Sequence, residues 1–217
     1  MTCLTISGLT HVDDIVMCAQ AGADRLGFVV EHPVAGPWNL SREEAGLLMG
    51  AAAGRAMRIA VVGGACETIG DILDVCRPDI VQLHGDEPPT TVAAIASRDV
   101  RVIKVIAIPS SAPPGQAEAL AAEARMFIDA GADEIMLDVV PALVTAAAEW
   151  QLAAAVAAQI DAPVILSGGL RAHNVVQALR AVGPWGVDVT AGVEGDGRRK
   201  SVPMVHAFIA AVHDADA

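Results

Sequence analysis

The chain has 217 residues with a formal net charge of −12, and hydrophobic residues make up 53% of it while aromatic residues make up 3%. The negative charge excludes a nucleic-acid-binding protein with a broad basic surface, and an anionic ligand would need local dipoles and a few placed cations. With no tyrosine and few aromatic residues, the core must consist of Val, Ile, Leu and Ala, which is typical of a parallel sheet buried on both faces.

The sequence carries no sign of a metal centre, a secretory leader or a membrane span. Its four cysteines, Cys3, Cys18, Cys66 and Cys76, lack the CxxC spacing of a metal site. No charged segment leads into an apolar stretch of the signal-peptide type, and no apolar run reaches the length of about 18 residues that a membrane helix needs. We therefore expect a cytoplasmic protein that binds neither a metal, a membrane nor nucleic acid.

Aliphatic runs that predict strands alternate with helical patterns along the whole chain. In chain order, the predicted strands are residues 3–7, 25–30, 57–62, 79–83, 101–107, 134–138, 163–166 and 186–189. The predicted helices are residues 11–21, 41–53, 67–76, 88–97, 115–130, 148–159, 171–182 and 201–213. Residues 41–44 form a capping box, and Gly22 and Gly131 follow helix ends, where a left-handed residue is needed.

Eight regular strand–helix units favour a single (β/α)8 barrel, the TIM barrel, over residues 1–217. A doubly wound sheet is the alternative architecture. No long linker divides the chain, and its softest segment, residues 110–115, is interpreted as a loop between a strand and a helix. In a barrel of this kind the active residues lie at the carboxyl ends of the strands.

Two neighbouring strand ends near the end of the chain open into turns of small residues. The backbone N–H groups of such turns converge, and a helix N-terminus behind them adds partial positive charge, so such turns bind phosphate. The loops after strands seven and eight are also the usual phosphate site of a TIM barrel. The alternative is that these residues only satisfy the geometry of the turns. The candidate phosphate-binding residues are Ser167, Gly168, Gly169, Thr190, Ala191 and Gly192.

Several segments, spread from the first predicted strand to the last, carry a family resemblance. They are residues 6–10, 21–28, 81–87, 102–105, 136–138, 167–175 and 186–194, and the most specific are Gln-Leu-His-Gly-Asp-Glu at 82–87 and the last segment. On these segments the chain resembles the phosphoribosylanthranilate isomerase family over its whole length. The resemblance implies a TIM-barrel enzyme of tryptophan biosynthesis that performs an Amadori rearrangement, an aldose–ketose isomerisation of an N-phosphoribosyl arylamine, without a cofactor.

The resemblance also implies an acid and a base. The family's general acid, an aspartate at the end of the sixth strand, falls on Asp138, which would protonate the ring oxygen and open the furanose. The family's general base, a cysteine at the end of the first strand, falls on Ser7. A serine hydroxyl needs a partner that takes its proton, so hydrogen bonding to the ligand is the other interpretation of Ser7. Cys3 lies roughly 13 Å along the strand from Ser7, and we expect it at the bottom of the barrel.

Two loops depart from the family pattern. Where the family has an arginine that binds the anthranilate carboxylate, this chain has Trp38, which is either a stacking platform for an aromatic ring or a hydrophobic lid. Residues 139–148 are apolar and contain no glycine, whereas the family has a Gly-rich loop there. We therefore expect a stiffer loop and an altered carboxylate-binding position.

Three further features allow two interpretations each. His84 is either a replacement base, since its pKa suits proton transfer near neutrality, or a structural histidine bonded to backbone, which the family pattern favours. Asp188 is interpreted as a substrate-binding residue that bonds a hydroxyl or orients the barrel mouth, and an ion pair with Lys104 is the alternative. The basic run 198–200 either adds positive charge near the phosphate turn or forms a solvated loop, which is the favoured interpretation.

The sequence therefore predicts an isomerase that acts, as a monomer or a homodimer, on a small phosphorylated sugar-amine. One alternative is a diverged paralogue acting on a different phosphosugar or aromatic substrate in a specialised pathway. The other is a non-catalytic protein that binds a phosphorylated metabolite.

Overall fold

The structure is a computed structural model that describes residues 1–109, 113–139 and 147–216. Its strands are β1 (Cys3–Ile6), β2 (Arg25–Val30), β3 (Asn39–Leu40), β4 (Met57–Val62), β5 (Ile80–Leu83), β6 (Arg101–Ile108), β7 (Glu134–Val139), β8 (Val164–Ser167) and β9 (Gly186–Val189). Its α-helices are α1 (Val12–Ala21), α2 (Arg42–Ala52), α3 (Cys66–Cys76), α4 (Pro89–Ala96), α5 (Gln116–Asp129), α6 (Ala147–Ala157), α7 (Val175–Val182) and α8 (Val202–Asp216). Two 3₁₀ turns, η1 (Ala191–Val193) and η2 (Asp196–Arg198), follow β9.

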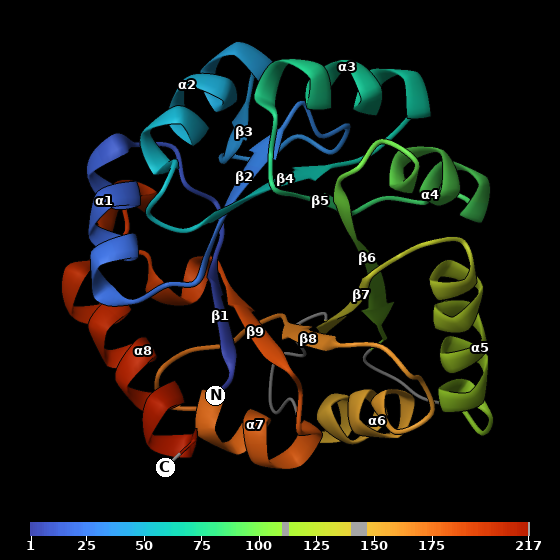
Figure 1. Cartoon of the computed structure of the whole chain (residues 1–217). Helices are drawn as coiled ribbons and strands as arrows, with labels where there is room; N and C mark the ends of the chain where they lie inside the picture. The colour runs from blue at the N-terminus through green and yellow to red at the C-terminus, as the bar shows by residue number, and fades with distance from the viewer. Residues whose placement is uncertain (110–112, 140–146, 217) are drawn as a thin grey trace.

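The strands close into a parallel barrel surrounded by helices. The order around the ring is β1-β9-β8-β7-β6-β5-β4-β2, and pairing of β1 with β2 closes it. Figure 1 shows the strands as a central ring with the helices arranged outside it. The predicted (β/α)8 barrel is therefore confirmed, and the doubly wound sheet is wrong because β1 pairs with both β9 and β2, which closes the ring.

One strand was not expected from the sequence. β3 pairs in parallel with the end of β2, with Val29 opposite Asn39 and Val30 opposite Leu40, and it lies outside the closed ring. Two residues are too short a run to show the alternation by which strands are recognised. This strand returns the segment after β2 to the barrel mouth, and thereby fixes the position of Trp38 immediately before it.

Alternation along the strands determines which side chains face the barrel interior. The interior cluster consists of Ile59, Val61, Ile80, Ile103, Val105, Met136 and Ile165. On β9, Val187 and Val189 pack outward against the helices, so Asp188 between them faces the interior. On β1, Leu4 and Ile6 pack outward, and Ser7 follows on the interior side. The interior of the barrel is thus apolar in the middle and polar at its mouth.

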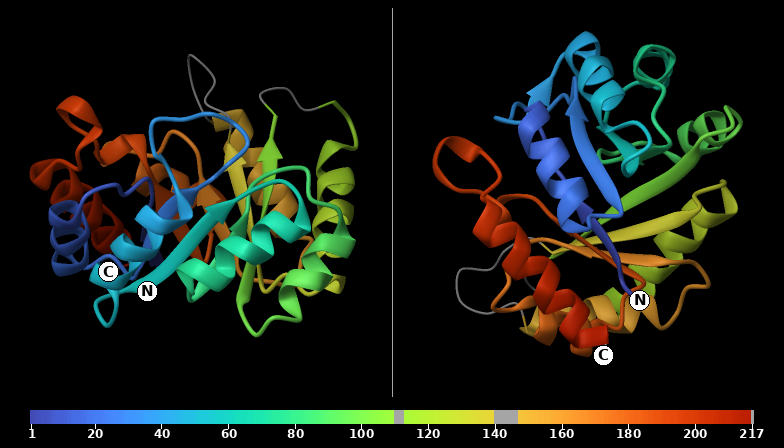
Figure 2. Two further views of the ribbon diagram at one scale, coloured as in Figure 1. Left: turned by 90° about the horizontal axis from the view of Figure 1, so that it is seen from above. Right: turned by 60° about the vertical axis from the view of Figure 1, so that its left-hand side comes forward.

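The chain termini lie close together, as both views in Figure 2 show. The backbone N–H of Thr2 donates to Asp216 Oδ2 at 2.6 Å, and the Thr2 hydroxyl donates to Oδ1 at 2.8 Å. Cys3 lies at this end of the barrel, where burial raises its thiol pKa to about 11. It is therefore at the bottom, as expected, and remote from Ser7 at the mouth.

Helix ends follow the local signals in most places. Ser41 caps α2 in a reciprocal box with Glu44, and Gly22 ends α1 with a left-handed φ of 109°. α7 differs, because it begins at Val175 rather than at residue 171. The preceding turn is held by Asn174, whose side chain accepts from the N–H of Arg171 and donates to a turn carbonyl. No helix in the described ranges is long and apolar enough to cross a membrane.

Candidate active site

A cavity of about 560 Å³ opens at the carboxyl ends of the barrel strands. Its wall contains every residue that the sequence suggested for the site: Ser7, Trp38, His84, Asp138, Ser167, Gly168, Gly169, Asp188, Thr190, Ala191 and Gly192. No group of three or more His, Cys, Asp or Glu side chains within the described ranges is arranged to hold a metal ion. The strand ends thus bring together residues that are up to 185 positions apart in the chain.

Asp188 lies buried at the base of the cavity and is held by two hydroxyl groups. Ser7 Oγ donates to Asp188 Oδ1 at 2.6 Å, and Ser167 Oγ donates to Oδ2 at 3.4 Å. Only 5% of Asp188 is exposed. Burial, reinforced by the negative charge of Asp138, raises the pKa of Asp188 to about 6, although the Ser7 hydrogen bond opposes this shift. Gly27 on β2 leaves the space for Ser7, because a Cβ there would overlap with the serine oxygen.

The suggested ion pair between Asp188 and Lys104 is wrong. Ile103 and Val105 face the barrel interior, so Lys104 between them points outward, away from Asp188. Its ammonium group instead pairs with Glu87 Oε2 at 3.0 Å, and both side chains are almost completely buried.

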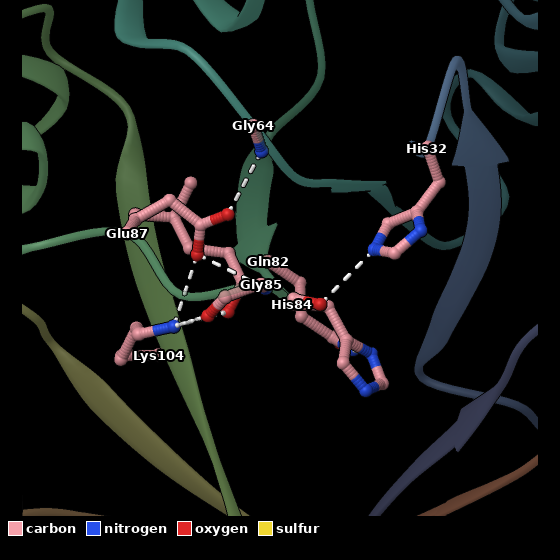
Figure 3. Close-up of polar contacts among 8 residues, drawn as sticks. His32, Gly64, Gln82, His84, Gly85, Glu87 and Lys104 are labelled. Carbon is pink, nitrogen blue, oxygen red and sulfur yellow. Dashed lines mark hydrogen bonds and ion pairs between the residues drawn. The ribbon is translucent and has the colours of Figure 1, made fainter. Parts of the chain in front are cut away.

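His84 faces the cavity, and its ring is directed away from the Glu87–Lys104 pair in Figure 3. Its Nε2 lies 3.7 Å from Asp138 Oδ2, with 40% of the histidine side chain and 27% of the aspartate side chain exposed. Within the described ranges no backbone group bonds to this ring, and its Nδ1 instead lies 3.4 Å from Gln82 Nε2, so these residues do not support the favoured interpretation of a backbone-bonded structural histidine. The backbone carbonyl of His84, rather than its ring, makes a contact with a neighbouring loop, through His32.

Figure 3 shows how that backbone is held. Glu87 accepts hydrogen bonds from the N–H groups of Gly64 and Gly85, each at 3.0 Å, while Lys104 donates to the Gly85 carbonyl. His32 Nε2 lies 3.0 Å from the carbonyl oxygen of His84. Burial by itself would raise the pKa of Glu87, but the hydrogen bonds and the charge of Lys104 hold it below its usual value. This network joins the loops after β2, β4 and β5.

His32 and Gln82 also line the cavity, and sequence reasoning assigned no role to either. Gln82 is buried, and its Oε1 has no hydrogen-bond partner among the described residues. It belongs to the Gln-Leu-His-Gly-Asp-Glu segment, and its position two residues before His84 places both side chains on the interior side of the strand. That spacing was the available signal. An unpaired buried carbonyl is costly, which makes Gln82 Oε1 a candidate hydrogen-bond acceptor for a ligand in this cavity.

The two small-residue turns pack against neighbouring backbone. Gly168 has φ 94°, and a Cβ there would overlap with the carbonyl oxygen of Val139. A Cβ at Gly192 would overlap with the carbonyl oxygen of Leu170, which belongs to the other turn. Turn geometry therefore requires glycine at both positions, and it brings the two turns into contact beside the same cavity. Arg171, which sequence reasoning also left without a role, lies next to them in the cavity wall.

The basic run 198–200 is not a solvated loop as a whole, so that favoured interpretation is wrong. Arg199 forms two hydrogen bonds to Asp14 at 2.8 and 2.9 Å. Lys200 is buried, and its Nζ donates to the Thr190 carbonyl at 3.0 Å and to Glu194 at 3.1 Å. Burial lowers the pKa of Lys200 against the opposing charge of Glu194. Lys200 thus places a cation directly behind the second turn.

Trp38 forms part of the cavity wall and is bonded across the end of β1 to the segment that follows β9. Its Nε1–H donates to Glu194 Oε1 at 2.7 Å, and its indole packs against Gly8. The guanidinium carbon of Arg198 lies 5.3 Å from the centre of the indole ring. These contacts hold the indole in the cavity wall. Of the apolar loop at 139–148, residues 140–146 lie outside the described residues.

A closed eight-stranded barrel with a polar cavity at the carboxyl ends of its strands defines the class of this protein as a TIM-barrel enzyme. The family model for N-(5'-phosphoribosyl)anthranilate (PRA) isomerase matches residues 4–211. The chain belongs to the N-(5'-phosphoribosyl)anthranilate isomerase family, and the resemblance predicted from its sequence is confirmed.

Similar proteins agree with this assignment. An N-(5'-phosphoribosyl)anthranilate isomerase of Azorhizobium caulinodans is 37% identical over 98% of this chain and 92% of its own. The structure of phosphoribosyl anthranilate isomerase from Thermotoga maritima is 28% identical, covers 99% of this chain and 100% of its own, and has a TM-score of 0.84. A phosphoribosyl anthranilate isomerase in complex with reduced 1-(o-carboxyphenylamino)-1-deoxyribulose 5-phosphate is also 28% identical, with the same coverage and a TM-score of 0.81.

Proposed function

We propose that this chain converts N-(5'-phosphoribosyl)anthranilate into the corresponding 1-arylamino-1-deoxyribulose 5-phosphate, the isomerisation of tryptophan biosynthesis. The observation that carries the proposal is that a buried carboxylate, a second carboxylate and two glycine turns meet in one cavity at the mouth of the barrel. The reaction needs an acid for ring opening, a base for proton removal and an anchor for the phosphate. The similar isomerase mentioned above binds a reduced form of the ketose that such a reaction produces.

The roles of the residues follow from their positions in the cavity. Asp138, at the end of β7, would protonate the ring oxygen and open the furanose. Backbone N–H groups of the two glycine turns would bind the phosphate, with Arg171 and the buried Lys200 as nearby cations. Gln82 Oε1 would accept a hydrogen bond from a ribose hydroxyl, because that hydroxyl would supply the partner that this buried oxygen lacks.

One observation favours a second candidate, an isomerase for an arylamine without the carboxylate. The segment after β2 contributes the Trp38 indole to the cavity, and the indole N–H is already bonded to Glu194. An indole cannot form an ion pair with a carboxylate. The Trp38 side chain itself thus favours stacking on a ring over recognition of an anion.

The test is a continuous fluorescence assay with freshly prepared N-(5'-phosphoribosyl)anthranilate, whose decay to the less fluorescent ketose reports turnover. A turnover number in the usual enzyme range of about 1–10³ per second supports the proposed function. The matched substrate is the N-phosphoribosyl derivative of aniline, which lacks the carboxylate. A kcat/KM for the aniline derivative at least tenfold above that for the anthranilate compound would establish the second candidate. No turnover of either compound would refute both.

Two matched variants test whether the first glycine turn binds the phosphate. Gly169 and Gly183 have nearly equal φ angles of 64° and 63°, but Gly183 ends α7 on the surface with open space around it. Gly169→Asp adds bulk and negative charge at the first turn, whereas Gly183→Asp adds the same groups away from the cavity. Inhibition by inorganic phosphate should be lost only in Gly169→Asp. Equal inhibition of both variants would contradict the phosphate assignment.

A further inference from the structure

We propose that Asp188 is the general base of the isomerisation and that Ser7 is its positioning residue. This inference rests on the proposed function. It concerns one of the positions at which the sequence departs from the family pattern, because the resemblance implies a cysteine that accepts the C2 proton where this chain has Ser7. A hydroxyl cannot do this at neutral pH without a partner that takes its proton.

The structure places a carboxylate one hydrogen bond from that hydroxyl. Ser7 Oγ donates to Asp188 Oδ1 at 2.6 Å, a length typical of a hydroxyl bonded to a carboxylate. Both residues line the same cavity, and both are buried. Their backbones are held in register, because β1 and β9 are paired neighbours with Thr5 opposite Asp188. The base position is therefore occupied by a hydroxyl–carboxylate pair instead of a single side chain.

Asp188 is surrounded by groups that keep its carboxylate available near neutrality. Asp138 on β7 raises its pKa, whereas the charges of His84 after β5 and Lys200 before α8 lower it, as does the Ser7 hydrogen bond. Ser167 on β8 contributes only a neutral hydroxyl. Burial is the largest influence, and the resulting pKa of about 6 leaves roughly nine-tenths of Asp188 ionised at pH 7. A base whose pKa lies close to the working pH is well matched to proton transfer.

The proposed step conserves atoms and charge. After Asp138 has protonated the ring oxygen, the open substrate is an iminium with C1 doubly bonded to nitrogen. The C2–H bond breaks, the proton goes to Asp188, and the electron pair forms the C1=C2 bond while the C1=N electron pair returns to nitrogen. The neutral enolamine then becomes the ketose when C1 gains a proton from Asp188 and the C2 hydroxyl gives its proton to Asp138. Both carboxyl groups return to their starting states.

The first variant is Asp188→Asn, in which the amide oxygen still accepts from Ser7. General-base removal predicts a fall in kcat of about 10²–10⁴-fold. Binding of the reduced ketose phosphate, measured by titration, should change by less than about threefold. Asp99→Asn is the matched control, because Asp99 lies exposed in a left-handed conformation that asparagine also accepts. A residue that only binds substrate would instead raise KM and leave kcat nearly unchanged.

The second measurement is a rescue. Adding Ser7→Cys to Asp188→Asn supplies a thiol at the base position and should restore kcat at least tenfold. The rise of kcat/KM with pH should then move from near 6 in the unaltered chain toward the ordinary thiol pKa of about 8.5. Ser7→Ala removes the hydrogen bond that lowers the pKa of Asp188. In this variant the rise of kcat/KM with pH should therefore shift above pH 6. If Ser7 had only a structural role, its replacement would not change the pH dependence of kcat/KM.

The outcomes separate this inference from the proposed function. If the unaltered chain fails to turn over N-(5'-phosphoribosyl)anthranilate, the proposed function itself fails. If the unaltered chain is active and the Asp188→Asn variant has the same kcat, Asp188 is not the base. The same follows if kcat/KM of the variant still rises near pH 6. A folded double variant that binds the reduced ketose phosphate without regaining activity would also overturn the inference, because a thiolate replaces a missing base.

Discussion

Asp188→Asn should stabilise the protein at neutral and alkaline pH. The pKa of Asp188 rises on folding from an ordinary 3.8 to about 6, chiefly because the carboxyl group is buried. A raised pKa means that the ionised form is disfavoured in the folded state, so stability is lost as the pH rises from about 4 to 6. The full pKa difference between the folded and unfolded states corresponds to a loss of about 3 kcal/mol in the free energy of unfolding above pH 6. An asparagine of nearly the same shape carries no such charge.

The diagnostic quantity is the pH dependence of the stability difference between the variant and the unaltered chain. Linkage predicts a stabilisation of about 2 kcal/mol at pH 5.2 that grows to about 3 kcal/mol at pH 8. The lowest pH of the measurement stays above the isoelectric point of about 4.7, where the protein would carry no net charge. Urea denaturation at intervals across this range measures both free energies of unfolding, and titrations common to both chains cancel in the difference.

The exposed Asp99→Asn variant provides the baseline, and its stability difference should stay within about 0.5 kcal/mol at every pH. A constant difference for Asp188→Asn across the range would refute the reasoning, because it would mean that Asp188 does not change its pKa on folding. Destabilisation at pH 8 would refute it as well. The expected result, greater stability with lost activity, is the trade-off typical of a strained active site.

Three further substitutions test other parts of the site. Glu87→Gln leaves its lysine partner on β6 buried without a counter-charge and should destabilise the protein by about 3 kcal/mol in urea denaturation; a loss below 1 kcal/mol would contradict this. Trp38→Phe removes the hydrogen bond to Glu194 and should raise KM by about three- to tenfold with kcat unchanged, so a fall in kcat alone would exclude a role of the indole in binding. Gly168→Ala should cost more than about 3 kcal/mol because its Cβ would overlap with the backbone at the end of β7, whereas the same change at the open Gly183 should cost about 1 kcal/mol; equal losses would refute the packing argument.

The sequence determined the barrel and most of the residues at its mouth, although it gave no role to His32, Gln82 or Arg171. Eight aliphatic runs separated by helical patterns specify strand–helix units, since strands buried on both faces must be apolar throughout. Chemistry-bearing residues directly after those runs, such as Asp138 and Ser167, then lie at the carboxyl ends of the strands. The two glycine turns were also visible, because close backbone packing requires residues without a side chain.

The tertiary structure alone decided which of these residues are partners. Lys104 pairs with Glu87 and not with Asp188, because a strand that is apolar on both faces does not disclose which of its sides faces the barrel interior. Ser7 and Asp188 are 181 residues apart, and they meet only because closure of the ring makes β1 and β9 neighbours in a definite register. Hydrophobic patterns are local, whereas ring closure and strand register depend on all the strands together. That is the physical reason why the sequence predicted that most of these residues lie at the barrel mouth but did not predict which of them pair.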